Sequence, residues 1–294
     1  MSAHIRQEAA MSLPVVPPRE PGYGHLVLIG GGEDRSDAMR VLKATWAIND
    51  AQTIAVIPSA SRYSVEAGRI YTRAFTKLGA KAIFVCDARN CDEAADPKMV
   101  EQVRMADMIF FSGGDQVRLA EILNGSPLLA AVRERFAQGA TVAGTSAGAA
   151  AASDPMLYDG DAYGFHKGSV GFAPGFNLLP GVAIDTHFVG RGRLPRMAQF
   201  LASKRCRLGI GLPEDTGIFI APDGTTRVVG TGVVTLLDAR AMDFSDYDLI
   251  DDDDNYTVEG LRLGFLAEGA VFDLKTWTVT SSRVKPAAPS APVQ

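Results

Sequence analysis

Residues 140–152 read ATVAGTSAGAAAA and change character halfway along. The first residues are small or β-branched, as in a buried strand, and the last are alanine-rich, as in a helix. Between them, Gly144-Thr145-Ser146-Ala147-Gly148 fits G-x-S-x-G, which places a serine on a tight strand-to-helix turn with its hydroxyl exposed. The plainer interpretation is a Gly/Ala turn with an incidental serine, but the flanking strand and helix favour the elbow. We therefore predict that Ser146 is a nucleophile and that the backbone N–H of Ala147 faces a developing oxyanion.

Apolar runs and helical patterns alternate at short spacing in the first half of the chain. That alternation is typical of an α/β fold with a doubly wound, mostly parallel sheet and helices on both faces. In such sheets ligands bind beyond the carboxyl ends of the strands. Three glycine-rich turns fall at such ends, namely Gly30–Gly32, Gly113–Gly114 and Gly144–Gly148. We expect them to converge on one site.

The second half of the chain has a different pattern. Residues 153–181 are rich in glycine and proline and are interpreted as loop. Short strands resembling hairpins follow from about residue 217, and we interpret them as an antiparallel β extension of the same domain. The chain is thus expected to form a single domain over residues 25–280, between an N-terminal tail at 1–24 and a C-terminal tail at 281–294.

The bulk properties exclude several classes of partner. The formal net charge is −5, so a nucleic-acid partner is not expected. No apolar run reaches the ~18 residues that indicate a membrane span, and the first residues lack the pattern of a signal peptide. A cytoplasmic protein without a membrane or nucleic-acid partner is the expectation.

No cofactor or metal is indicated by the sequence. The turn after the first strand would need three glycines to fit a dinucleotide fingerprint, but Arg35 occupies the third glycine position. The three cysteines, Cys86, Cys91 and Cys206, have neither a zinc spacing nor enough members for a disulfide framework. A nucleophilic cysteine is the weaker alternative to the serine.

A serine hydroxyl needs a base to take its proton. His166 and His187 are the histidines that follow Ser146, and His187 is the better candidate because it ends a predicted strand. The second oxyanion donor would be a backbone N–H of Gly113 or Gly114.

The base in turn needs a carboxylate that fixes its tautomer. Asp185, Glu214 and Asp215 are candidates. Asp185 would share a strand face with His187 but lie too far along it to pair easily with the ring, whereas Glu214 can approach from the side. We favour Glu214, which gives the order serine, histidine, acid, unless an acid of residues 154–161 serves instead. An α/β-hydrolase would have the acid before the histidine.

Four motifs together resemble those of the cyanophycinases, serine exopeptidases of the peptidase E-like (S51) group in the class I glutamine amidotransferase-like superfamily. The resemblance covers roughly residues 24–280. The motifs are Gly113-Gly114-Asp115-Gln116, Gly144-Thr145-Ser146-Ala147-Gly148-Ala149, Asp185-x-His187-Phe188-x-x-Arg191-x-Arg193-x-x-Arg196 and Gly209-x-Gly211-x-x-Glu214-Asp215-Thr216.

The resemblance implies a flavodoxin-like, glutamine amidotransferase-like fold and a homodimer that works without a metal or cofactor. It implies hydrolysis of cyanophycin, a poly-aspartate backbone whose β-carboxyls carry arginine, to β-Asp-Arg dipeptides through an acyl-enzyme on Ser146. His187 would be the base and Glu214 its orienting acid, with Gly114 and Ala147 forming the oxyanion hole. The residues that would bind substrate are Gln116, Asp185, Arg191, Arg193 and Arg196.

Two alternatives stay open at this point. A related dipeptidase would cut short aspartyl or isoaspartyl peptides, and a binding protein would keep the fold without activity. The three arginines beside the base suit a carboxylate-rich ligand, because guanidinium groups bind carboxylates bidentately and cations at a helix start oppose its dipole. One departure from the resemblance is Thr186, where the cyanophycinase motif has glutamine, so subsite preference is expected to differ.

Overall fold

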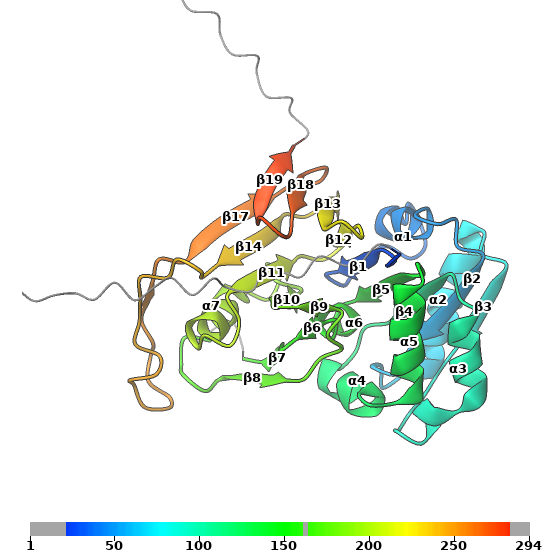
Figure 1. Ribbon diagram of the computed structural model, residues 1–294, viewed down its shortest axis with the longest axis horizontal. Coiled ribbons are helices and arrows are strands. Elements are labelled where there is room, and N and C mark those ends of the chain that lie inside the picture. The colour runs from blue at the N-terminus through cyan, green and yellow to red at the C-terminus, as the bar shows by residue number, and fades with distance from the viewer. Residues whose placement is uncertain (1–21, 161–163, 283–294) are drawn as a thin grey trace, which may run out of the picture.

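The computed structural model describes residues 22–160 and 164–282, so most of the two expected tails, 1–24 and 281–294, lies outside the described residues (Figure 1). A nine-stranded sheet runs through the molecule in the order β19-β18-β13-β12-β1-β5-β4-β2-β3. Its parallel part consists of β1 (Leu26–Ile29), β5 (Thr141–Thr145), β4 (Met108–Phe111), β2 (Thr53–Ile57) and β3 (Ala82–Val85).

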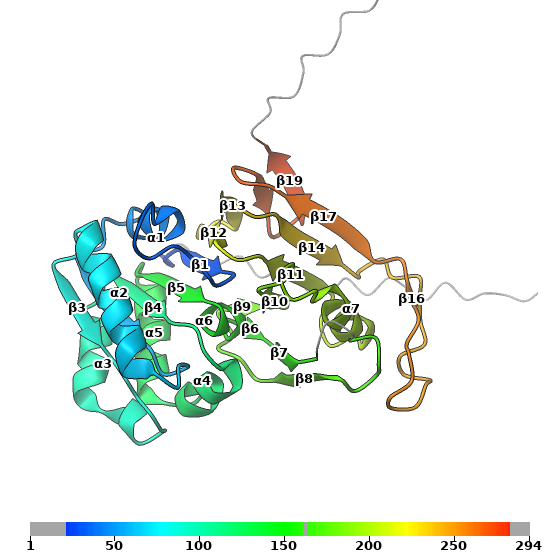
Figure 2. The same cartoon turned by 180° about the vertical axis from the view of Figure 1, so that it is seen from behind.

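Helices cover both faces of this parallel part, as Figures 1 and 2 show. Successive strand residues point to opposite faces, so Leu26 and Leu28 pack in one apolar cluster while Val27 and Ile29 pack in another. One face carries α1 (Arg40–Trp46) and α2 (Ser64–Leu78). The other carries α3 (Pro97–Arg104), α4 (Gln116–Leu123), α5 (Pro127–Ala137) and α6 (Ala147–Ala150). The predicted doubly wound α/β fold is confirmed.

Local sequence determines where these helices begin. The Asp115 carboxylate accepts hydrogen bonds from the backbone N–H groups of Val117 and Arg118 at the start of α4. The Ser126 hydroxyl does the same for Leu129 in α5, which begins with Pro127. Such side-chain caps satisfy N–H groups that have no partner within the helix, and proline at the first position loses none.

The antiparallel extension continues the same sheet beyond β1. Strand β12 (Thr216–Ile220) pairs antiparallel with β1, and β13 (Thr225–Gly230), β18 (Val271–Asp273) and β19 (Thr278–Ser281) follow outward. The predicted start of the extension, near residue 217, thus falls in β12. The limits of the single domain, 25–280, stay a prediction.

A smaller sheet lies beside the first and carries the segments that complete the site. Its order is β10 (Val182–Thr186), β11 (Leu208–Leu212), β14 (Val234–Asp238) and β17 (Arg262–Leu266), with β10 and β11 parallel. Helix α7 (Leu194–Ala202) connects β10 to β11 and packs on this sheet. The remaining short elements are η1 (Glu93–Ala95), β6 (Ser153–Asp154) paired with β9 (Leu179–Pro180), and β15 (Phe244–Ser245) paired with β16 (Val258–Glu259).

The prediction that residues 153–181 form only loop is wrong. Strand β7 (Met156–Asp159) and strand β8 (Val170–Ala173) form a hairpin in which Met156 pairs with Ala173. Met156 and Leu157 are fully buried in apolar clusters, so packing from outside the segment stabilises strands that its glycine-rich sequence does not indicate. In the described part of the chain, no helix combines the length and the apolar character needed to cross a membrane.

Candidate active site

Ser146 lies on a strained turn between β5 and α6. Its backbone angles are φ 50° and ψ −114°, a region that a residue with a side chain rarely adopts. The two flanking glycines permit the turn. A Cβ on Gly144 would lie 2.4 Å from the Gly148 carbonyl oxygen, and a Cβ on Gly148 would lie 2.6 Å from Phe111. The geometry is that of the predicted elbow, with the hydroxyl directed away from the sheet.

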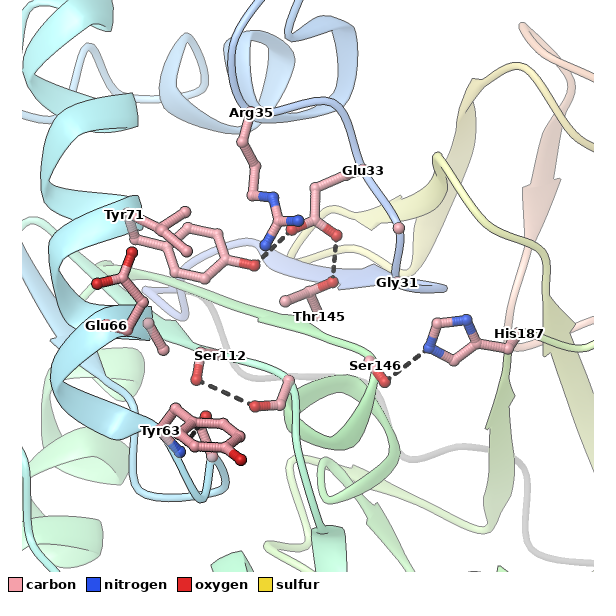
Figure 3. A pocket seen from close by; sticks show the side chains of 15 residues that line it. Gly31, Glu33, Arg35, Tyr63, Glu66, Tyr71, Ser112, Thr145, Ser146 and His187 are labelled. Carbon is pink, nitrogen blue, oxygen red and sulfur yellow. Dashed lines mark hydrogen bonds between the residues drawn. The ribbon is translucent and has the colours of Figure 1, made fainter.

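The structure brings Ser146, His187 and Glu214 into one line of hydrogen bonds. The Ser146 Oγ lies 2.9 Å from His187 Nε2, and His187 Nδ1 lies 2.6 Å from Glu214 Oε1 (Figure 3 shows the first contact). An ionised carboxylate only accepts, so Nδ1 carries the proton and Nε2 is free to accept from the serine. The side chain of His187 is 13% exposed and that of Glu214 is 58% exposed, so Glu214 is the more solvated of the two.

The glycine-rich turn after β1 holds all three segments together. Three successive carbonyl oxygens of this turn, those of Ile29, Gly30 and Gly31, accept hydrogen bonds at 2.9 Å from the N–H groups of Ser146, His187 and Asp215, respectively. The sequence indicated that a backbone meets a ligand at this turn. The structure shows that this backbone binds the three segments that carry Ser146, His187 and Glu214.

Glycine is required at this turn by close contact with the triad. Gly31 has φ +94°, and a Cβ there would lie 2.5 Å from both Cε1 and Nε2 of His187. Gly32 has φ +61°, and a Cβ there would lie 3.2 Å from the Glu214 side chain. The imidazole can therefore reach Ser146 only because residue 31 has no side chain.

Replacing Gly31 by alanine is expected to lower kcat about 100-fold, because the new methyl group pushes the imidazole away from the Ser146 hydroxyl by a substantial fraction of an ångström. Gly125→Ala is the matched control. Gly125 also has a positive φ of +77°, but no heavy atom of the described residues lies within 4 Å of its Cβ position. Steady-state kinetics on both variants separates the clash from backbone strain, and equal losses in the two would contradict the expectation.

The expected oxyanion donors lie close to Ser146. Ala147 is the first residue of α6, where a backbone N–H has no partner within the helix. A Cβ on Gly113 would lie 3.2 Å from the Ser146 Cβ, whereas one on Gly114 would meet the backbone of Ala60. Gly113 is therefore the residue of this turn that lies beside the serine, and the role of Gly114 N–H as an oxyanion donor stays a prediction.

A pocket of about 370 Å³ opens on one side of Ser146 and His187 (Figure 3). It is enclosed by the turn after β1, the start and one face of α2, and the turn after β4. Most of its lining residues could not be predicted from the sequence to have a role in a site. Glu33 directly follows the Gly30–Gly32 turn, but neither that position nor the sequence of α2 indicates a pocket. The polar lining residues besides Ser146 and His187 are Glu33, Arg35, Ser61, Tyr63, Glu66, Tyr71, Ser112 and Thr145.

Two residues predicted to bind substrate are paired with each other. Asp185 is 1% exposed and Arg196 is 2% exposed. Arg196 Nε donates to Asp185 Oδ2 at 2.7 Å, its Nη2 donates to Asp185 Oδ1, and its Nη1 donates to the Asp159 carbonyl at 2.7 Å. The structure thus engages both side chains with each other and with the backbone inside the protein, and their predicted contact with substrate stays untested.

Arg193 belongs to the same cluster. Its Nη1 donates to the Thr186 carbonyl at 2.7 Å and to Asp185 at 3.2 Å. Burial lowers the pKa of the Arg193 guanidinium to about 10, although the Asp185 carboxylate opposes that change. Arg193 therefore stays cationic at neutral pH and fixes the backbone just before His187.

Three further residues that were singled out from the sequence differ in how accessible they are. Arg191 is exposed, three residues before α7. Gln116 is half-buried and donates to the Leu157 carbonyl at 3.4 Å. Thr186 is 4% exposed, so the departure from the glutamine of the motif lies beneath the surface of the site. Neither Arg191 nor Gln116 lines the pocket beside Ser146.

Replacing Arg196 by methionine is expected to lower the free energy of unfolding by about 3 kcal/mol, because the buried Asp185 carboxylate loses its bidentate partner. Urea unfolding measures the change. Arg191→Met removes an exposed guanidinium from the same segment and is expected to change stability by less than about 0.5 kcal/mol. A similar small change in both variants would mean that the buried pair stabilises little.

The other candidates for base and acid are engaged elsewhere. His166 Nδ1 lies 3.1 Å from the Asp253 carbonyl. Asp154 accepts from the Gly175 N–H at 3.2 Å, and Asp215 accepts from the Asp34 N–H at 3.2 Å. Cys86 is buried, and burial raises the pKa of its thiol to about 12, which disfavours the reactive thiolate.

The serine of an elbow at the carboxyl end of a parallel strand, in hydrogen-bond contact with a histidine that a carboxylate holds, defines the class of serine-type hydrolases. Within that class, the chain belongs to peptidase family S51, whose family model matches residues 26–228. It is a serine-type peptidase.

Curated relatives extend the match beyond the family model. The chain is 35% identical over 255 residues to a cyanophycinase of Geminocystis herdmanii, covering 85% of this chain and 94% of the relative. It is 33% identical over 267 residues to a cyanophycinase of Synechococcus elongatus, covering 90% and 83%. A solved peptidase from an acI-B1 Actinobacterium has the same fold, with a TM-score of 0.65, 22% identity, and coverage of 85% of this chain and 97% of that one.

Proposed function

We propose that this chain is a serine exopeptidase that hydrolyses cyanophycin to β-Asp-Arg dipeptides through an acyl-enzyme on Ser146. The observation that carries the proposal is the hydrogen-bonded line from Ser146 through His187 to Glu214. The curated relatives are cyanophycinases that match this chain over most of their length, and they support cyanophycin as the substrate. The alternative, a dipeptidase for short aspartyl or isoaspartyl peptides, is not favoured by these relatives.

The proposed reaction has two halves. The Ser146 oxygen attacks the carbonyl carbon of the scissile amide while its proton passes to Nε2 of His187. The imidazolium then gives that proton to the leaving nitrogen as the carbon–nitrogen bond breaks, which leaves an ester on Ser146. A water molecule, deprotonated by the same imidazole, attacks the ester, and the proton returns to the serine oxygen as the acid product departs. Glu214 keeps the Nδ1 proton in place throughout.

The surrounding groups would stabilise charge and hold the polymer. The proposed oxyanion donors are the backbone N–H groups of Ala147 and Gly114. Removing one such donor costs roughly 3–4 kcal/mol of transition-state stabilisation. Exposed Arg191 and half-buried Gln116 remain proposed substrate contacts. Asp185, Arg193 and Arg196 would act by supporting the segment that carries His187.

Incubation of the purified protein with cyanophycin, followed by mass spectrometry, tests the substrate directly. The expected result is the accumulation of β-Asp-Arg as the main product. A panel of aspartyl and isoaspartyl dipeptides run in parallel tests the alternative, which requires turnover of the short peptides and none of the polymer. Absence of β-Asp-Arg after long incubation would overturn the proposal.

We also propose that the enzyme acts in the cytoplasm as a homodimer, with no metal, nucleic-acid or membrane partner. Support comes from the resemblance to the cyanophycinases and from the acidic net charge of −5. Light scattering after size-exclusion chromatography tests the dimer, and a mass of about 31 kDa would contradict it.

A further inference from the structure

Glu33 places a buried carboxylate in the wall of the pocket beside Ser146. Its residue is 4% exposed, yet it lines the pocket together with Ser146 and His187. Tyr71 Oη donates to Glu33 Oε1 at 2.5 Å, and Thr145 Oγ1 donates to Glu33 Oε2 at 2.5 Å (Figure 3). Such short distances are typical of hydroxyl groups that donate to a carboxylate. Each carboxylate oxygen keeps a further site for accepting a hydrogen bond.

The cation nearest to this carboxylate's partner Tyr71 is Arg35, which forms no salt bridge with Glu33 in the described part of the chain. Within residues 22–160 and 164–282, no lysine, arginine or histidine nitrogen lies within salt-bridge distance of Glu33. Arg35 lies across the Tyr71 ring, with its guanidinium carbon 6.0 Å from the ring centroid. Burial and the neighbouring Glu33 raise the pKa of Tyr71 although Arg35 opposes the change, so the Tyr71 hydroxyl keeps its proton and stays a donor. In the described part of the chain the hydrogen bonds to the Glu33 side chain come from two hydroxyls, which leaves acceptor sites for a cation from outside.

The rest of the pocket suits a flat, extended cation. Tyr63 is 81% exposed at the pocket, so its ring face is available for stacking. Glu66 of α2 also lines the pocket and adds a second carboxylate. Its side chain is 56% exposed and lies 3.6 Å from the Arg73 guanidinium. A guanidinium group, which is planar and carries five N–H donors, can meet a carboxylate and an aromatic face together.

We propose that this pocket is the subsite for a guanidinium group of the substrate and that Glu33 is its specificity-determining residue. The inference rests on the proposed function, which supplies a substrate bearing arginine side chains beside the scissile bond. It adds the place and the residue that select arginine. Arg35, at the same pocket, is positioned to pair with the free carboxylate that such an arginine also carries.

The competing explanation is that Glu33 only holds the elbow in shape. Thr145 precedes Ser146, so its hydrogen bond to Glu33 could position the nucleophile without any contact to substrate. The two roles differ in what they change. A positioning role lowers kcat for every substrate, whereas a specificity role raises KM for a guanidinium substrate and leaves an uncharged one unaffected.

The test compares two oligopeptide substrates of the β-Asp-Arg type that differ only in arginine or citrulline, which has the same length but no charge. The wild-type enzyme is expected to prefer arginine at least tenfold in kcat/KM. In Glu33→Gln that preference should fall nearly to unity, through a higher KM for arginine and an unchanged kcat/KM for citrulline. Glutamine can still bond both hydroxyls, so the elbow should persist. Glu101→Gln, an exposed change on α3, is the control and should keep the preference.

A binding measurement keeps this inference separate from the proposed function. Saturation-transfer NMR with agmatine, a small guanidinium compound, should detect binding to the wild-type protein that weakens at least tenfold in Glu33→Gln. An unchanged arginine preference, equal loss of kcat for both substrates, or equal agmatine binding in both proteins would overturn the subsite. Failure of the wild-type protein to cut cyanophycin, with agmatine binding that depends on Glu33, would overturn only the proposed function.

Discussion

Replacing Ser146 by alanine is expected to lower kcat roughly 10⁶-fold, the scale of loss seen when a serine nucleophile is removed from a complete triad. The expectation follows from geometry, because the Ser146 Oγ is the atom that lies 2.9 Å from His187 Nε2 at the open side of the elbow. Without that oxygen no acyl-enzyme can form. Hydrolysis of cyanophycin, followed by release of β-Asp-Arg, measures the loss.

The variant should keep its structure and its affinity for substrate. Alanine tolerates the elbow backbone no worse than serine, so the free energy of unfolding should change by less than about 1 kcal/mol. Ser203→Ala is the matched control, since the Ser203 hydroxyl only donates to the Phe200 carbonyl at the end of α7. Activity within tenfold of wild type in Ser146→Ala would assign the reaction to another nucleophile. A serine-directed phosphonate should label the wild-type protein and leave this variant unlabelled.

The elements of the sheet could be predicted because their signals are local. The strands β1, β2, β4 and β5 are short apolar runs, and α3 and α5 begin with proline after a capping residue. The hairpin of β7 and β8 could not be predicted in this way. Its strands are stabilised by contacts of Met156 and Leu157 with clusters formed by distant segments.

The site divides along the same line. Ser146, His187 and Glu214 each follow a recognisable strand, so their places at the carboxyl ends of strands could be predicted, although β5 belongs to the nine-stranded sheet and β10 and β11 belong to the smaller one. The buried pair of Asp185 and Arg196 could not be predicted, since the motif alone cannot tell a guanidinium that binds substrate from one that binds its own chain.

The residues that line the pocket beside Ser146 could not be predicted from the sequence either. Glu33 has partners 38 and 112 residues away, at Tyr71 and Thr145. No periodicity or spacing links positions so far apart. The role of the Gly30–Gly32 turn could not be predicted in full for the same reason, because a Cβ there would meet side chains from the turns after β10 and β11.

Replacing Glu214 by glutamine is expected to lower kcat about 10³-fold while changing KM little. Glu214 contacts the imidazole and not the reacting atoms, so it is a positioning residue for His187. The amide can present an N–H to Nδ1, which favours the wrong tautomer, and it cannot stabilise the imidazolium that forms when the serine proton is taken. The expected loss of kcat is smaller than for a fully buried acid, because the Glu214 side chain is 58% exposed and water replaces part of its effect.

Glu214→Asp separates orientation from mere structure. A shorter carboxylate can still accept from Nδ1 after a small shift, so it should recover at least tenfold in kcat over Glu214→Gln, whereas a purely structural role would make both variants equally poor. Asp154→Asn provides the comparison with the other acid segment, and because Asp154 is bonded to the Gly175 backbone it should leave kcat within about threefold of wild type. Full activity in Glu214→Gln together with loss in Asp154→Asn would transfer the role of orienting acid to residues 154–161. The distance of 2.6 Å between Glu214 Oε1 and His187 Nδ1 favours Glu214 as the orienting acid, because a carboxylate that close determines which nitrogen carries the proton.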